Sequence, residues 1–167
     1  MKTFCITTMI VALLLLCTNS SQAQTTQTKL NQVELLKQFL GTWKGETAKD
    51  TTMITEYLPF GSAMEGIDKV ITKGKTINSI KELCGYDKKN DKIINVELNE
   101  SSLEITSYAF WFTSKNILEG ILLQDISNPD KAILKYKIEF KSSDMWVETL
   151  TQNNKVVSVL TFNREKK

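Results

Sequence analysis

Histidine is absent from the 167 residues of this chain, and that absence limits its chemistry more than any motif present. Zinc sites built on histidine, haem held by a proximal histidine, and Ser-His-Asp or Cys-His catalytic groups are all excluded. The glycine-rich phosphate-binding patterns of dinucleotide and nucleotide sites do not occur either. We therefore expect no bound metal and no cofactor.

Carboxylates are the remaining groups that could do acid–base chemistry. Five of them are scattered over four expected strands: Glu56, Glu65, Asp68, Glu82 and Glu148. Two could meet inside a closed sheet as an acid/base pair, but nothing in their spacing singles out such a pair. The pattern favours surface charges with occasional hydrogen-bonded interior acids. We expect no catalytic residue and no enzyme activity.

Aromatic side chains give the more specific indication. Tyr108 and Phe110 share one face of a strand with Phe112, and further aromatic residues lie on other strands. An apolar cavity with a few polar groups is the usual form of a small-molecule site, whereas small barrels are often filled by their own side chains. We expect a cavity whose ligand-binding residues are Tyr57, Tyr86, Tyr108, Phe110, Tyr136 and Trp146.

These residues lie on a series of short strands separated by polar turns, which indicates an all-β fold. The expected strands span 42–48, 51–58, 63–72, 76–86, 92–99, 103–113, 117–124, 132–141, 145–152 and 156–164. Because each connection is short, consecutive strands should be antiparallel neighbours in an up-and-down barrel of eight to ten strands. Alternation is clearest from Leu134 to Lys141. The inward phase of 51–58, 63–72 and 117–124 stays open, because both their faces are apolar.

A short helix precedes the first strand. Apolar residues recur at the three- and four-residue intervals of one helix face between Leu30 and Leu40, with Thr28 or Asn31 as the N-cap. Gly41 stands where a helix commonly stops. The period then changes to two, which places the Trp43 indole at the first inward position of the strand, where it can plug one end of a closed sheet.

Gly41-Thr42-Trp43 after a short helix resembles the Gly-x-Trp signature that opens lipocalins and related calycin barrels. The chain is most similar to small exported bacterial lipocalin-like domains of unknown function. That similarity extends over about residues 30–165 and includes Leu35-Leu36, Gly85-Tyr86-Asp87, Leu118-Glu119-Gly120 and Thr161-Phe162-Asn163-Arg164. The resemblance implies that Arg164, the one arginine of the chain, packs across Trp43 and closes the barrel together with Gly41. Binding of a ligand carboxylate is the alternative role for this arginine.

Residues 1–23 are expected to be a signal peptide. Lys2 precedes an apolar run that ends at Cys17, and Ser21-Gln22-Ala23 places small residues before a cleavage site. The run is too short for a membrane span, which needs ~20 residues. A lipoprotein signal with acylated Cys17 is the alternative, but Leu16 stands where such signals need a small residue. We expect an exported, periplasmic or secreted domain of residues 24–167.

Removal of that segment leaves 20 basic and 19 acidic side chains, a balance that predicts no nucleic-acid partner. It also leaves Cys84 as the one cysteine, which we expect to be a small buried hydrophobe. The leading hypothesis is a non-enzymatic protein that binds a small hydrophobic or amphipathic molecule. A solid barrel that docks on an envelope protein and a carboxylate-based enzyme are the alternatives. The oligomeric state stays open.

Overall fold

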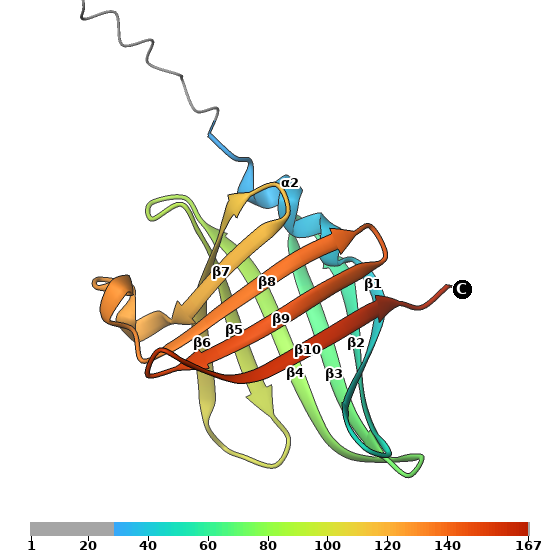
Figure 1. Cartoon of the computed structure of the whole chain (residues 1–167). Coiled ribbons are helices and arrows are strands. Elements are labelled where there is room, and N and C mark those ends of the chain that lie inside the picture. Colours follow the sequence, from blue (N-terminus) through green and yellow to red (C-terminus); the bar gives the residue numbers. More distant parts are fainter. Residues whose placement is uncertain (1–28, 167) are drawn as a thin grey trace, which may run out of the picture.

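A computed structural model describes residues 29–166, and within this range ten strands form one closed antiparallel barrel (Figure 1). The strands are β1 (Gly41–Ala48), β2 (Thr51–Phe60), β3 (Ala63–Thr72), β4 (Lys75–Asp87), β5 (Lys92–Asn99), β6 (Ile105–Ser114), β7 (Ile117–Leu122), β8 (Leu134–Ser142), β9 (Met145–Gln152) and β10 (Lys155–Arg164). The predicted signal peptide lies outside the described residues.

Each strand pairs with the next along the chain, and β10 pairs with β1 to close the barrel. The predicted up-and-down fold is thereby confirmed. Tight turns make this order possible: between β9 and β10, Asn153 and Asn154 both adopt positive φ, of 50° and 60°. That combination matches the twist of the flanking strands in two-residue hairpins, and asparagine tolerates it better than most residues.

The alternation predicted for the eighth strand is present in β8. Ile138 and Phe140 are buried, while Lys137 and Lys141 are exposed. In β10 the predicted phase is wrong at one point. A register irregularity between Val156 and Ser158 leaves the Val156 side chain 61 % exposed.

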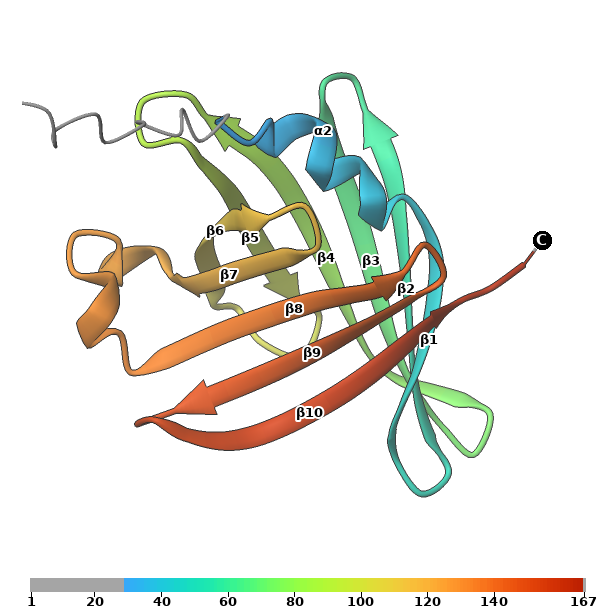
Figure 2. The same cartoon turned by 45° about the horizontal axis from the view of Figure 1, so that its top comes forward.

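The predicted N-terminal helix consists of α2 (Gln32–Leu36) and the 3₁₀ turn η1 (Lys37–Phe39), and it covers one end of the barrel (Figure 2). Asn31 is the N-cap, because its side chain accepts a hydrogen bond from the backbone N–H of Glu34. The buried Gln32 side chain fastens the helix to β6. Its amide nitrogen donates to the Phe112 carbonyl (3.2 Å), and its amide oxygen accepts from the Phe112 N–H (2.6 Å).

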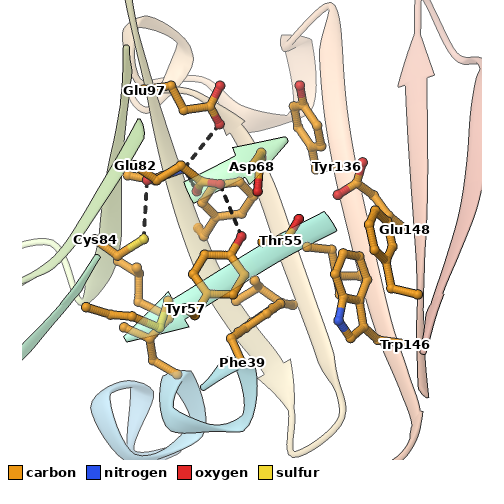
Figure 3. Close-up of a pocket in the computed structure, with 18 of the residues that line it drawn as sticks. Phe39, Thr55, Tyr57, Asp68, Glu82, Cys84, Glu97, Tyr136, Trp146 and Glu148 are labelled. Carbon is orange, nitrogen blue, oxygen red and sulfur yellow. Dashed lines mark hydrogen bonds between the residues drawn. The ribbon is translucent and has the colours of Figure 1, made fainter. Parts of the chain in front are cut away.

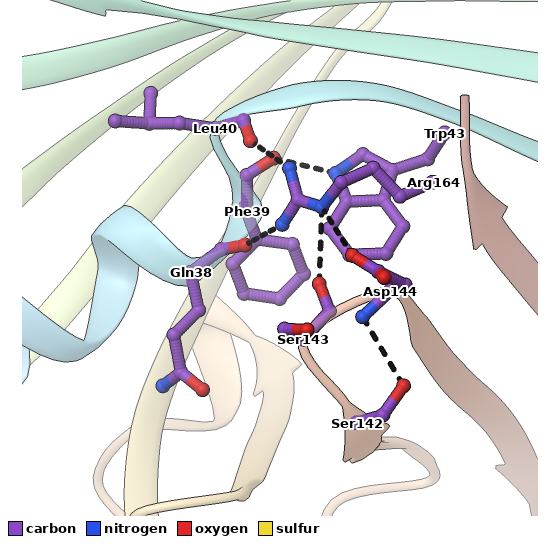
Figure 4. A network of polar contacts seen from close by, with 8 residues as sticks. All are labelled: Gln38, Phe39, Leu40, Trp43, Ser142, Ser143, Asp144 and Arg164. Atoms are coloured by element: carbon purple, nitrogen blue, oxygen red, sulfur yellow. Dashed lines mark hydrogen bonds and ion pairs between the residues drawn. The ribbon is translucent and has the colours of Figure 1, made fainter. Parts of the chain in front are cut away.

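Arg164 lies over Trp43 at the same end, with its guanidinium carbon 4.0 Å from the centre of the fully buried ring (Figure 4). Its nitrogens donate to three backbone carbonyls, those of Gln38 (3.0 Å), Leu40 and Ser143 (3.0 Å). One side chain therefore joins the helix, the first strand and the β8–β9 turn. An ion pair with Asp144 (3.6 Å) adds to these contacts.

Gly41 is required by this arrangement. Its φ of +116° is one that side-chain-bearing residues rarely adopt. A Cβ atom at this position would lie 2.6 Å from a guanidinium nitrogen of Arg164. The Trp43 indole N–H meanwhile donates to the Phe39 carbonyl at 2.6 Å, which ties the end of the helix to β1.

The predicted seventh and eighth strands were each drawn two residues too long at their shared connection. The chain instead turns through η2 (Leu123–Asp125) and η3 (Pro129–Lys131). This connection packs on the outer face of β6 and β7, where Ala109, Ile121 and Ala132 form a second buried cluster. The connection therefore covers Ile121 and explains why the seventh strand is apolar on both faces.

Burial of the inward side chains decreases along the barrel away from the helix. Phe39, Trp146 and Phe162 are buried at the helix end, whereas Leu150 and Leu160, farther along the same inner surface, are half-buried. Solvent therefore reaches the interior from the end opposite α2. Within residues 29–166, no helix is long and apolar enough to cross a membrane.

Candidate functional site

The barrel encloses a cavity of about 200 Å³ whose wall changes character along its length. Near the helix it is lined by apolar groups, among them Phe39, Trp146 and Phe162. Farther along, the lining is polar and acidic, and side chains from opposite walls turn into the same space (Figure 3). An apolar region beside a cluster of convergent polar groups is the usual form of a small-molecule site.

Four of the six predicted ligand-binding residues line this cavity: Tyr57, Phe110, Tyr136 and Trp146. Tyr108 is buried but does not line the cavity. Its ring centre lies 5.9 Å from that of Phe110 and 5.3 Å from that of Tyr136, so it packs against two residues that do.

Tyr86 lies away from the cavity. It stands near the end of β4, and its hydroxyl donates to the Asp91 carboxylate at 2.5 Å, beside the β4–β5 turn. The alternation of the strand carries its side chain to the inner face but too close to the rim to reach the cavity. Tyr86 therefore belongs to the end of β4 and is not part of the cavity wall.

Four carboxyl groups line the cavity, and they come from four strands: Asp68 from β3, Glu82 from β4, Glu97 from β5 and Glu148 from β9. Asp68, Glu82 and Glu148 were among the dispersed acids of the sequence, and Glu97 was missed. Glu97 lies two residues after the inward Asn95 on β5, so the alternation of that strand could have indicated that it faces the interior. Of the other two acids considered, Glu56 is exposed, and Glu65 pairs with Lys81 at 2.6 Å.

Glu82 is the centre of a hydrogen-bond network. Its carboxylate accepts from the Tyr57 hydroxyl (3.2 Å) and from the Asn95 amide (2.8 Å). The same amide donates to Glu97 at 3.2 Å. A Cβ at Gly66 would lie 2.6 Å from the Tyr57 ring, so glycine at this position leaves the space in which the ring packs. Through its amide, Asn95 links Glu82 on β4 to Glu97 on β5.

Cys84 is buried, as expected, and its thiol donates to the Asn95 side-chain oxygen at 3.2 Å. Burial raises the pKa of this thiol far above its ordinary value, and the nearby Glu82 carboxylate acts in the same direction. A thiol that stays protonated is a poor nucleophile. Cys84 therefore contributes to the wall of the cavity and to its hydrogen bonding.

Burial raises the pKa of all four acids, because the interior solvates a charged carboxylate poorly. The pKa values of Glu97 and Glu148 rise to about 7, with the charge of Asp68 as the second cause in each. The pKa of Glu82 rises well above its ordinary value through burial and then through Asp68. The pKa of Asp68 also rises through burial, although hydrogen bonds from Glu82 and Thr55 oppose that rise. The pKa values of Glu82 and Asp68 are therefore both raised, because the two acids are buried in the same cavity.

Two buried polar atoms of the lining have no hydrogen-bond partner: one carboxylate oxygen of Asp68 and the indole nitrogen of Trp146. Unpaired polar atoms are costly to bury, so a partner from a ligand would offset that cost. Among the described residues of the lining there is neither lysine nor arginine. Within residues 29–166, no group of acids and cysteine has the geometry to hold a metal ion.

No protein-family model matches this chain, and no curated protein matches it.

Proposed function

We propose that this protein is an exported, lipocalin-like barrel that binds a small amphipathic molecule without transforming it. The observation that carries the proposal is the cavity of about 200 Å³, with an apolar region, a polar region and two unpaired buried polar atoms in its wall. The volume is below the ~300–1,000 Å³ of pockets for drug-sized ligands, which favours a ligand with a single ring or a short chain.

The lipocalin-like assignment is supported by the closed antiparallel barrel and by the closure at its helix end. A helix followed by Gly41-Thr42-Trp43, with Arg164 from the last strand over the indole, is the arrangement that the family resemblance implies. Because Arg164 donates its hydrogen bonds to backbone carbonyls, it is not available to a ligand carboxylate in the cavity. That alternative role is therefore not part of the proposal.

The docking-module alternative has less support. An exposed aromatic patch at residues 110–112 beside a filled interior would favour it. Phe112 is buried, Phe110 lines the cavity, and the outward Trp111 packs at the margin of the second cluster with the Lys92 ammonium 4.5 Å from its ring centre.

An acid–base enzyme is the second candidate, because the inward acids that it requires are present. The pKa of about 7 for Glu97 and Glu148 is in the range that general acid–base catalysis uses near neutral pH. Against it, the interior thiol is held protonated, and the chain has no histidine to activate a nucleophile. A ligand recovered unchanged after prolonged incubation would favour the carrier, and a product would favour the enzyme.

Native mass spectrometry of protein purified gently from its natural host tests the proposal. We expect a releasable adduct of small mass, and binding of hydrophobic fluorescent probes once the adduct is removed. Ile80→Trp should abolish both, because this side chain lines the cavity, whereas Ile77→Trp on the exposed part of β4 should leave both intact. A protein with no adduct that also ignores the probes would contradict the proposal.

A further inference from the structure

The acidic half of the cavity has an excess of negative charge and of acceptor atoms that the lining itself does not balance. Four carboxyls from four strands meet there, and the described lining offers no lysine or arginine in return. Burying acids without a cation is expensive, and proteins generally pair buried charges. In this interior the acids are partly neutralised by protons instead.

An independent observation shows that the hydrogen bonding of the cavity is also incomplete. Asp68 is 7 % exposed, and one of its carboxylate oxygens accepts no hydrogen bond. Two donors in the acidic part of the wall are engaged, since the Tyr57 hydroxyl and the Asn95 amide both bond to Glu82, and the unpaired Trp146 indole N–H lies toward the helix end. What is missing is a donor that approaches from within the cavity.

The rest of the wall indicates what should carry that donor. Phe39, Phe110 and Trp146 supply apolar and π-electron surface in the same cavity, and Tyr136 lies in its acidic part, near Glu148 (Figure 3). Aromatic faces attract cations as well as apolar groups. An ammonium group has three donors and no acceptor, so it complements both the charge and the acceptor excess.

We propose that the ligand of this barrel is a small organic cation, a protonated amine on an apolar or aromatic body. The amine lies among Asp68, Glu97 and Glu148 and donates to the open oxygen of Asp68. The apolar body extends toward the helix end and packs on Phe39 and Trp146. This inference rests on the proposed ligand-binding function and adds the chemical class of the ligand.

Three probes that share a phenyl ring and differ in their polar end test this class. They are 2-phenylethylamine, 2-phenylethanol and 3-phenylpropionate, titrated by calorimetry into the adduct-free protein at pH 8. We expect the amine to bind at least tenfold more tightly than the alcohol, a ratio that corresponds to ~1.4 kcal/mol. We expect the carboxylate to bind most weakly, because it would meet four acids.

The variant Glu148→Gln should reduce this preference for the amine to threefold or less, because it removes one charge while keeping the size of the side chain. Glu56→Gln, on the exposed face of β2, is the matched control and should leave the preference unchanged. The comparison of probes on the unaltered protein stands even where a variant fails to fold.

The outcomes separate this inference from the proposed function. If the alcohol binds as tightly as the amine, or the carboxylate binds most tightly, the barrel binds ligands but the cationic class is wrong. If calcium chloride displaces the amine at equal concentration, the site takes inorganic cations and the inference also fails. If none of the three probes binds, both the inference and the proposed function are contradicted.

Discussion

Raising the pH from 5 to 8 should destabilise this protein, and the cause lies in the cavity. Glu97 and Glu148 have a pKa of about 7 in the folded chain, against an ordinary value of 4.5. Between these two values the folded protein keeps protons that the unfolded chain has released. The stabilisation is therefore fully present below pH 4.5 and is lost as the pH rises through about 7.

The magnitude follows from the two pKa values. A pKa difference of one is worth about 1.4 kcal/mol, and linkage places about 2.5 kcal/mol of the loss for each glutamate between pH 5 and pH 8. Because Glu97 and Glu148 share a cavity, their contributions are not simply additive, and we expect about 3–5 kcal/mol together. For a domain of this size that loss lowers the melting temperature by on the order of 10 °C.

Urea unfolding at constant ionic strength across this pH range measures the effect directly. The double variant Glu97→Gln/Glu148→Gln should lose most of the pH dependence, since glutamine does not titrate. Glu56→Gln, whose side chain is exposed on the outer face, is the control and should retain the dependence of the unaltered protein. A free energy of unfolding that is constant or rises from pH 5 to pH 8 would refute the reasoning, as would a double variant with the full original slope.

Four further outcomes are expected. Arg164→Ala should lower the free energy of unfolding by about 2–4 kcal/mol in urea titrations, because it uncovers Trp43 and leaves three backbone carbonyls without their donor. An unchanged midpoint of urea unfolding would count against the closure of the barrel by Arg164. Gly41→Ala should cost about 1–3 kcal/mol in the same assay, through its positive φ and the approach of the guanidinium, and a neutral result would mean that the backbone relaxes freely. Binding of 2-phenylethylamine at pH 7 should release protons from the interior glutamates. The release is measured by calorimetry, as a heat of binding that varies with the ionisation enthalpy of the buffer. Binding without proton release at pH 7 would contradict a contact between the amine and these acids. The intact mass of the protein purified from its natural host should correspond to a chain that begins at Gln24, and an acylated chain that begins at Cys17 would establish the lipoprotein alternative.

Most of the fold could be predicted from the sequence because it depends on local features. The ten strands were placed to within about two residues by their period of two and by the Asn, Asp, Ser and Gly residues between them. The short connections then required antiparallel neighbours. The helix, its Asn31 cap and the inward position of Trp43 are local in the same sense, since each depends on residues within one or two turns of chain.

The candidate site was only partly predictable. Tyr57, Phe110, Tyr136 and Trp146 were assigned to a common interior because large aromatic side chains are buried in most contexts. Tyr86 was assigned with them, but its strand reaches the rim and its hydroxyl bonds to Asp91. The contact of Gln32 with Phe112 had no signal in the sequence, since the two residues are 80 positions apart.

The acids of the cavity show most clearly which features the sequence determines and which depend on the tertiary structure. Alternation along each strand is a property of the backbone, but the inward phase of the strand that carries Asp68 stayed open because both of its faces are apolar. Which inward side chains then meet depends on strand register and on the closure of β10 against β1, and these are set by the packing of the whole barrel. The raised pKa values arise from that meeting, because desolvation by the assembled walls and the charges of the facing acids exist only in the folded chain.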